Sequence, residues 1–176
     1  MKAINQLQEN EPRWFAVYTK YKCEKYVSDN LARKGIEVYL PLLDRVKVYA
    51  SKTKKYKVPL ISCFVFVRIT KAEYIKVLET EYVFNFLKQR RDLIAIPDKE
   101  INLLKRLVGE YELSLCEEKV DWKLGQKMEV IAGQLTGLQG ILIEKSNKSD
   151  FVVELQNIGI QLRMQFNKAH LMPLVL

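Results

Sequence analysis

The sequence predicts an α+β fold in which an antiparallel sheet is flanked by helices and is followed by a small all-β barrel. In the first hundred residues, strand-like runs are interrupted by segments with the period of an amphipathic helix, which is typical of an α+β sandwich. After residue 124, short strand-like runs follow one another at turn residues with no helix between them, which is typical of a small barrel. The two parts also differ in charge.

The first elements follow from side-chain periodicity. Residues 13–19, RWFAVYT, carry mostly apolar or aromatic side chains in both alternating sets, as in a central strand covered on both faces. The segment 21–35 repeats its apolar residues every four positions and ends at Gly35, a residue type that commonly follows the last turn of a helix. Residues 36–41 are strand-like and end in a proline, which suits the edge of a sheet.

A basic stretch and a strongly β-prone stretch come next. Residues 45–57, RVKVYASKTKKYK, contain six basic side chains and no acidic one. The first half alternates like a strand, and the second half is interpreted as the tip of a basic hairpin near nucleic acid. Residues 58–69, VPLISCFVFVRI, are expected to form a strand with Phe64 and Phe66 on the same face.

The remainder of the α+β part is expected to contain two helices and two short strands. The helix at 71–81 should turn Tyr74, Ile75 and Leu78 inward, and the helix at 97–111 should begin with Asp98 as its N-cap. Strands are expected on either side of a QRRD turn, at 82–88 and 93–97.

Breaks in these patterns predict the domain bounds. Residues 1–12 are a polar tail, and residues 13–111 form the α+β domain. Residues 112–123, ELSLCEEKVDWK, break the periodicity, carry acidic charge and are interpreted as a linker. Residues 124–176 form the barrel, whose strands are expected at 127–132, 139–144, 150–156, 160–166 and 170–174.

The basic charge is confined to the first part of the chain. Residues 1–100 contain 20 Lys and Arg against 12 Asp and Glu, and residues 101–176 contain 9 of each, so the whole excess of +8 lies in the first part. Such asymmetry indicates that the α+β part faces a polyanion while the barrel does something else.

Composition excludes several functional classes. The three cysteines are widely spaced without a CxxC pair and the single histidine, His170, stands near the chain end, so no disulfide framework, metal site or His-based catalytic set is expected. No cofactor is expected, and the protein is predicted not to be an enzyme. No apolar run reaches the roughly 18 residues of a membrane span, and the N-terminus lacks a secretory signal, so the predicted location is a reducing cytoplasm.

The stretch 130–144, VIAGQLTGLQGILIE, contains Gly133, Gly137 and Gly140. A phosphate-binding glycine loop needs a helix directly after it, because the N–H groups of that helix bind the anion. The sequence that follows here is strand-like instead. The glycines are therefore interpreted as turn residues that supply positive φ or allow close backbone approach at a barrel corner.

Two of these stretches resemble a known family. GQKMEVIAGQLTGLQGILIEK, residues 125–145, resembles a KOW motif, with an SH3-like turn of other ancestry as the open alternative. RWFAVYTKYKCEKYVSDNLARKGIEVYLP, residues 13–41, resembles the opening of the NusG N-terminal domain. That family has a later signature strand, aromatic-Pro-Gly-Tyr-Val-aromatic-Val. Its counterpart ISCFVFV keeps the aromatic residues and departs from the pattern at residues 61–63.

The altered signature and the YTK exit of the first strand resemble specialised members of the family. The most similar are the UpxY-type antiterminators of polysaccharide operons, with RfaH as a more distant relative. The resemblance implies a transcription elongation factor that suppresses pausing and termination. It also implies an apolar depression that binds the tip of the clamp helices of RNA polymerase's largest subunit. The matching residues are Tyr18, Phe64, Phe66 and Phe84. The alternative role for such aromatics is plain core, which is the stronger interpretation for Trp14.

The resemblance further implies contact with the displaced non-template DNA strand, at positions matching Lys20 and its neighbours. Basic groups beside an aromatic ring suit single-stranded nucleic acid, because the charges follow the phosphates and a ring stacks on a base. A solvated surface is the commoner role for any one lysine, but the charge asymmetry favours a site. The predicted nucleic-acid-binding residues are Lys20, Tyr21, Lys22, Lys25, Lys88, Arg90 and Arg91.

The barrel is implied to recruit a second partner, a ribosomal protein or Rho, and the chain is expected to be a monomer. Tethering to the first domain would raise the effective concentration of that partner. Two alternatives stay open. One is a general housekeeping NusG-type factor, and the other is an RNA-binding KOW protein associated with the ribosome.

Overall fold

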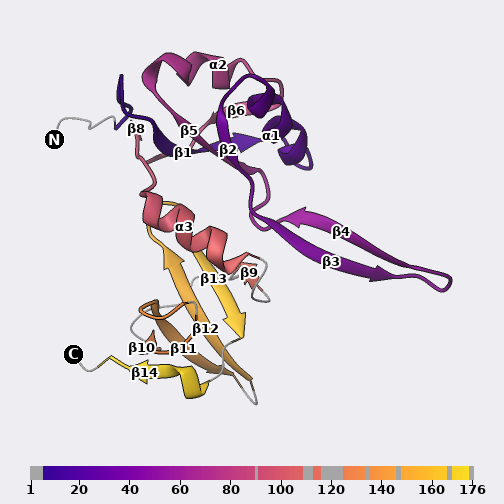
Figure 1. Ribbon diagram of the computed structural model, residues 1–176, viewed down its shortest axis with the longest axis vertical. Helices are drawn as coiled ribbons and strands as arrows, with labels where there is room; N and C mark the ends of the chain where they lie inside the picture. Colours follow the sequence, from indigo (N-terminus) through magenta and orange to yellow (C-terminus); the bar gives the residue numbers. More distant parts are fainter. Residues whose placement is uncertain are drawn as a thin grey trace. The chain divides into compact units, whose positions relative to one another are not determined.

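The computed structural model describes residues 6–89, 91–108, 113–115, 125–133, 135–145, 148–165 and 168–174. The chain groups into two compact units, Met1–Asn102 and Leu103–Leu176. The first contains an antiparallel sheet with helices, and the second contains a six-stranded antiparallel sheet (Figure 1). The predicted fold class, an α+β domain followed by a small all-β KOW-like module, is confirmed.

The main sheet of the first unit has four antiparallel strands in the order β2-β5-β1-β6. These strands are β1 (Arg13–Thr19), β2 (Glu37–Tyr39), β5 (Phe64–Ile69) and β6 (Val83–Phe86). Strand β1 lies inside the sheet, which explains why both of its alternating side-chain sets are largely buried, as predicted.

Helices α1 (Glu24–Arg33) and α2 (Tyr74–Leu78) contribute to the hydrophobic core of this sheet. Val27 and Leu31 of α1 recur one helical turn apart and are fully buried in that core, as the four-residue periodicity predicted. Gly35 has a φ of +79°, the left-handed conformation that commonly follows a helix. The predicted helix at 21–35 is therefore confirmed, with shorter bounds.

The prediction that Ile75 turns inward is wrong. Its side chain is 56% exposed, and Val77 is the fully buried residue of α2. The cause lies at the start of the segment, where a 3-10 turn, η1 (Lys71–Glu73), precedes the helix and shifts its phase. Thr70 and Glu73 form a capping box there, in which the Thr70 N–H donates to the Glu73 carboxylate at 2.9 Å.

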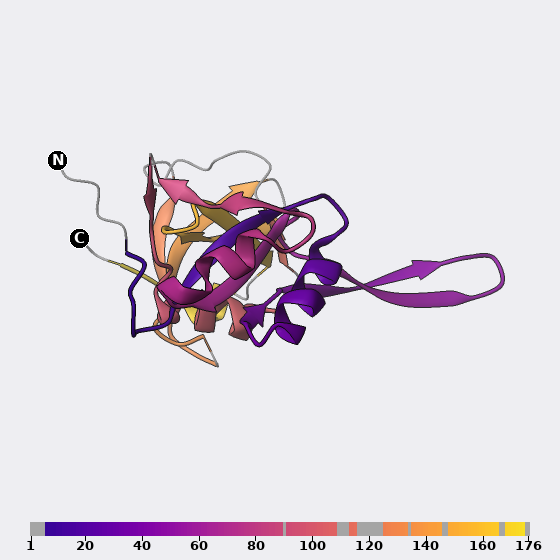
Figure 2. The same ribbon diagram turned by 90° about the horizontal axis from the view of Figure 1, so that it is seen from above.

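The basic stretch forms a separate two-stranded sheet of β3 (Leu42–Val48) and β4 (Thr53–Pro59). We call this hairpin the ribbon, and it projects away from the four-stranded sheet (Figure 2). The second half of 45–57, predicted as a hairpin tip, is mostly strand, because Lys54 and Lys55 pair with β3 and the turn closes earlier, between Tyr49 and Lys52. The strand predicted at 58–69 is divided, since β4 ends at Pro59 and β5 begins at Phe64.

Two short strands, β7 (Lys88–Gln89) and β8 (Asp92–Leu93), precede helix α3 (Asp98–Leu107). Asp98 is the first residue of α3 rather than its N-cap, and its carboxylate accepts a hydrogen bond from the Trp14 indole N–H at 3.0 Å. The division between the two units falls after Asn102, inside α3. The predicted bounds of 13–111, 112–123 and 124–176 stay a prediction.

The second unit contains six strands in the order β14-β10-β11-β12-β13-β9, and every pair is antiparallel. Their bounds are β9 (Leu113–Leu115), β10 (Gln126–Val130), β11 (Gln139–Lys145), β12 (Lys148–Leu155), β13 (Ile160–Gln165) and β14 (Leu171–Pro173), with a 3-10 turn, η2 (Lys168–His170). The five predicted strands are confirmed. Strand β9 was missed, since it falls inside the predicted linker, where its backbone pairs with β13 and extends the sheet.

The three glycines of residues 130–144 serve the β10–β11 hairpin. Gly133 and Gly137 have φ values of +83° and +86°, and the Gly137 N–H donates to the Val130 carbonyl at 2.8 Å. Gly140 lies in β11, where an added Cβ would come within 2.5 Å of the Val152 carbonyl oxygen. Strand β11 follows the turn directly, so the interpretation as turn and close-approach glycines is confirmed.

Candidate partner and nucleic-acid surfaces

An aromatic surface lies on the four-stranded sheet, which we define as Tyr18, Phe64 and Phe84. Tyr18 and Phe64 are register partners on β1 and β5, so their side chains share one face, and their ring centroids are 4.5 Å apart. Phe84 lies on β6, the strand on the other side of β1. Phe84 is 68% exposed and Tyr18 is 38% exposed, so large apolar side chains face solvent here.

A β-bulge exposes Phe84. Asn85 pairs with Tyr18 and Val83 pairs with Thr19, so Phe84 between them has no residue opposite it. A bulge leaves the extra residue unpaired, bends the strand and redirects a side chain, and bulges concentrate near functional sites. The register of the sheet therefore accounts for the exposure of Phe84, an exposure that is costly in water for a large aromatic side chain.

Phe66, predicted for the same site, lies beneath the surface. Its side chain has no exposed area, and its ring stacks against Tyr39 at a centroid distance of 6.2 Å. It therefore offers no contact surface in this structure. Trp14 is also buried, at 4% exposure, which agrees with the interpretation of that residue as core.

Backbone strain concentrates where β1 ends. Among the residues that the structure describes, three other than glycine have positive φ, namely Lys22 at 64°, Cys63 at 64° and Tyr82 at 66°. Two of them are joined to β1, because the Thr19 N–H donates to the Cys63 carbonyl and the Lys20 N–H donates to the Tyr82 carbonyl, each at 2.9 Å. Such conformations cost on the order of 1–3 kcal/mol each and cluster at functional sites.

A buried carboxylate holds this strained junction. Glu24, the first residue of α1, is 3% exposed and accepts a hydrogen bond from the Cys63 N–H at 2.7 Å. Desolvation, and then the charge of Glu24, raise the pKa of the Cys63 thiol above its usual range. The thiol is therefore kept protonated, and Glu24 has a structural role.

Sequence reasoning missed three residues that organise the basic turn. The Lys20 ammonium lies 5.2 Å from the centre of the Tyr82 ring, and that ring lies 5.4 Å from the ring of Tyr26. The Tyr26 hydroxyl donates to the Glu81 carboxylate at 2.8 Å. Hydrogen bonds from Tyr26 and from Tyr82, and the charge of Lys20, lower the pKa of Glu81. No local pattern brings these residues together, since Tyr26 and Glu81 are 55 positions apart.

The predicted residues after β1 form a basic turn, defined as Lys20, Tyr21, Lys22 and Lys25. Tyr21 is 61% exposed, and the Lys22 ammonium lies 5.2 Å from the centre of its ring. This pair offers an open aromatic ring beside a positive charge, the combination that suits single-stranded nucleic acid. Lys25 instead donates to the backbone carbonyl of Lys57 at 2.6 Å, which ties α1 to the ribbon.

The second predicted basic cluster lies at the separate two-stranded sheet of β7 and β8. Lys88 and Arg91 are exposed, and Arg90 lies outside the described residues. Leu87, next to Lys88, is bonded to the middle of β1, because its N–H donates to the Ala16 carbonyl. The basic turn begins at Lys20, four residues further along the chain, and four residues of extended chain span roughly 13 Å. The structure therefore does not bring the two clusters into one patch.

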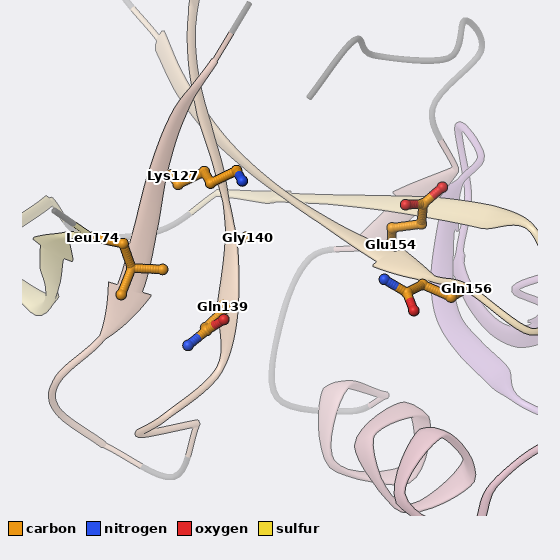
Figure 3. Close-up of a pocket in the computed structure, with 6 residues that line it drawn as sticks. All are labelled: Lys127, Gln139, Gly140, Glu154, Gln156 and Leu174. Atoms are coloured by element: carbon orange, nitrogen blue, oxygen red, sulfur yellow. The ribbon is translucent and has the colours of Figure 1, made fainter. Parts of the chain in front are cut away.

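A pocket of about 380 Å³ opens on the second unit (Figure 3). It is lined by Lys127, Gln139, Gly140, Glu154, Gln156 and Leu174. Within the part of the chain that the structure describes, no group of three or more His, Cys, Asp or Glu side chains could hold a metal ion. Among the same residues, no helix is long and apolar enough to span a membrane.

Comparison with known proteins identifies the family of the chain. A family model described as "Transcription termination factor nusG" matches residues 12–105, which is more than half of the chain. A search of curated proteins found no match.

Among solved structures, "Domain interaction in Thermotoga maritima NusG" is 19% identical, covers 94% of this chain and 98% of that chain, and has a TM-score of 0.57, which shows a shared fold. Two structures of the MjSpt4:Spt5 complex, in conformations B and A, are each 18% identical to this chain. The matches cover 93% and 92% of this chain and 97% of the matched chain in each structure, with TM-scores of 0.31 and 0.29. Those two scores are too low to support an argument. The family match decides the matter: the chain belongs to the NusG family, a family of transcription factors rather than enzymes.

Proposed function

We propose that this protein is a transcription antitermination factor that binds the clamp helices of RNA polymerase's largest subunit through its aromatic surface. The observation that carries the proposal is the exposure of Phe84 at a β-bulge of β6, the strand that pairs with β1, on which Tyr18 contacts Phe64 of β5. Exposed aromatic side chains clustered on a domain are typical of protein–protein contact sites. Family membership supports RNA polymerase as the partner.

The proposed mechanism is a shift in populations rather than a chemical step. One side of the first unit binds the clamp through the aromatic surface, and its edge at α2, where Ile75 is exposed, meets the opposite side of the DNA cleft. Bridging both sides stabilises the closed clamp relative to the paused state, in proportion to the difference in binding free energy between the two states. The protein acts as a monomer, without a cofactor, in the cytoplasm.

The basic turn binds the displaced non-template DNA strand in this proposal. Tyr21 offers a ring for stacking, and the ammonium groups of Lys20 and Lys22, each held near an aromatic ring, follow the phosphates. The strained backbone at Lys22 and Tyr82 supports a functional role for this junction. The factor acts on a specialised set of operons of the polysaccharide type. Its KOW-like second unit recruits a ribosomal protein or Rho.

Alanine substitution of Phe84 tests the polymerase site. Because its side chain is mostly exposed, Phe84→Ala should leave the fold intact while weakening binding to polymerase by about 30-fold, the effect of losing a contact of roughly 2 kcal/mol. Ile131→Ala, which removes an exposed apolar side chain from the second unit, is the matched control. Binding is measured with intact RNA polymerase and with its clamp-helix fragment. Equal affinities for the two variants would exclude Phe84 from the interface, and co-purification with ribosomes instead would favour the ribosome-associated alternative.

Charge reversal tests the DNA site. Replacing Lys20 and Lys22 with Glu should reduce single-stranded DNA binding and its dependence on salt, since fewer counterions are released. Replacing Lys99 and Arg106 of α3, both exposed, with Glu changes the charge by the same amount at residues that are not part of the basic turn. If both double variants bind DNA alike, the non-template strand is held elsewhere. Pause-release assays on candidate leader sequences then separate a specialised factor from a general one.

A further inference from the structure

The ribbon carries most of the net charge of the protein. Its residues 42–59 contain six Lys and Arg and one acid, Asp44, so they contribute +5 of the total +8. A two-stranded hairpin is marginally stable on its own, and repulsion between these like charges destabilises it further. The base of the ribbon is held in place by the bond from Lys25 to the Lys57 carbonyl and by the Leu60 N–H, which donates to the Pro41 carbonyl at 2.8 Å.

The charge is distributed unequally between the two faces of the ribbon. Residues opposite each other in an antiparallel pair share a face, and here Arg45 pairs with Tyr56 while Lys47 pairs with Lys54. Tyr49, two residues beyond Lys47, continues the same face. We call these five residues the basic face, and none of them is acidic. The opposite face carries Asp44, Val46, Val48, Thr53, Lys55 and Lys57.

The basic face contains a like-charge pair that is unfavourable in the free protein. Lys47 and Lys54 are directly opposite, where Cβ atoms lie about 5 Å apart and equal charges destabilise the pairing. The described residues provide no ion pair for either lysine. A polyanion bound across the face would convert this repulsion into attraction, so the pattern fits a binding surface better than a solvated one.

The two-stranded form of the ribbon favours a duplex over a single strand. The Lys47 ammonium lies 5.1 Å from the centre of the Tyr49 ring. Tyr56 lies opposite Arg45. The hydroxyls of both partly exposed tyrosines remain available as donors to phosphate oxygens. The major groove of B-DNA, moreover, admits a two-stranded β-ribbon.

We propose that the ribbon is a second nucleic-acid site, separate from the basic turn, which lies in the major groove of duplex DNA with its basic face toward the groove. Arg45, Lys47 and Lys54 bind phosphates of the two strands, and Tyr49 and Tyr56 add hydroxyl contacts. The ribbon projects from the four-stranded sheet (Figure 2). The site is independent of polymerase binding, because its residues do not belong to the aromatic surface.

The test compares two double variants of the full chain with the same charge change. Lys47→Gln with Lys54→Gln alters the basic face, and Lys55→Gln with Lys57→Gln alters the opposite face. Binding to a 20-base-pair duplex is measured across a range of salt concentrations. If each lysine of the basic face neutralises one phosphate, the first variant should lower the slope of log K against log salt by about 1.8 and weaken binding on the order of 60-fold at 0.1 M salt. The second variant should stay within a few-fold of wild type.

Two further measurements make the result decisive. Hydrogen exchange in the ribbon should show equal or greater protection in the first variant, because the like-charge pair is gone, so weaker binding cannot be attributed to unfolding. A single strand of the same sequence is tested in parallel. Equal losses in both variants, no loss in either, or a loss confined to the single strand would each overturn the proposal. Binding to polymerase is measured separately, so a failure of the ribbon site leaves the proposed function intact.

Discussion

Gly140 offers a sharp test of how the second unit is packed. It lies in β11, has no positive φ, and was expected from the sequence to be either a turn glycine or a close-approach glycine. An added Cβ would lie 2.5 Å from the Val152 carbonyl oxygen and 2.6 Å from Cζ of Phe151, a fully buried ring. Gly140→Ala must therefore displace the backbone of the neighbouring strand β12.

The expected loss follows from two opposing effects. Overpacking costs about 1–3 kcal/mol, and the upper half of that range applies because the nearest atom is backbone. Alanine also restricts the unfolded chain, which stabilises the fold by about 0.4–1 kcal/mol. The net loss in unfolding free energy for Gly140→Ala is therefore about 1–2.5 kcal/mol. Gly137→Ala, with positive φ and open space around it, should lose about 1 kcal/mol through backbone strain alone.

Asparagine substitution separates overpacking at Gly140 from backbone strain at Gly137. Asn tolerates positive φ, so Gly137→Asn should recover most of the loss, whereas the larger side chain at Gly140 should deepen it. The measurement is native-state hydrogen exchange of β11 and β12 amides, because the two compact units need not unfold together. A loss below about 0.5 kcal/mol in Gly140→Ala, or recovery in Gly140→Asn, would refute the close-approach reasoning.

Other predictions address the first unit. Tyr26→Phe removes the hydrogen bond to Glu81, so the pKa of Glu81 should rise toward its ordinary value in a side-chain NMR titration, while Tyr21→Phe should leave it unchanged. A carboxylate with a lowered pKa stabilises the fold above its ordinary pKa and loses that stabilisation as pH falls through the folded value, so Tyr26→Phe should also flatten the loss of stability in acid. Trp14→Phe leaves the Asp98 carboxylate without the indole donor and should lower stability by about 1–2 kcal/mol in denaturant titrations followed by circular dichroism. Asp98→Asn keeps an acceptor and should lose less, and equal losses would contradict this role for the bond.

Periodicity along the chain was sufficient to predict the fold class and most elements. The four-residue repeat of α1, the apolar alternation of β1 and the five strands of the second unit all depend on neighbours in sequence. The prediction failed where non-local contacts set the outcome. The 3-10 turn before α2 shifted Ile75 outward, and backbone pairing with β13 made a strand at Leu113–Leu115.

The candidate sites were only partly predictable. The resemblance to the NusG family selected Tyr18, Phe64 and Phe84 and the lysines after β1. The confinement of positive charge to the first part of the chain supported the choice of the lysines. The same reasoning also selected Phe66, which is buried, and it overlooked Tyr26, Glu81 and Tyr82.

The linear sequence was thus enough for the composition of the two parts, the confinement of positive charge to the first, and the identity of the turn glycines, since each is a property of residues close together in the chain. The basic face of the ribbon depends on the register of one local hairpin. Two other features depend on strands that are distant in the sequence: the bulge that exposes Phe84 and the positive-φ junction after β1. Shifting a strand by one residue would move every side chain to the other face. Such register is set by the packing of the whole sheet, and no local pattern of residues encodes it.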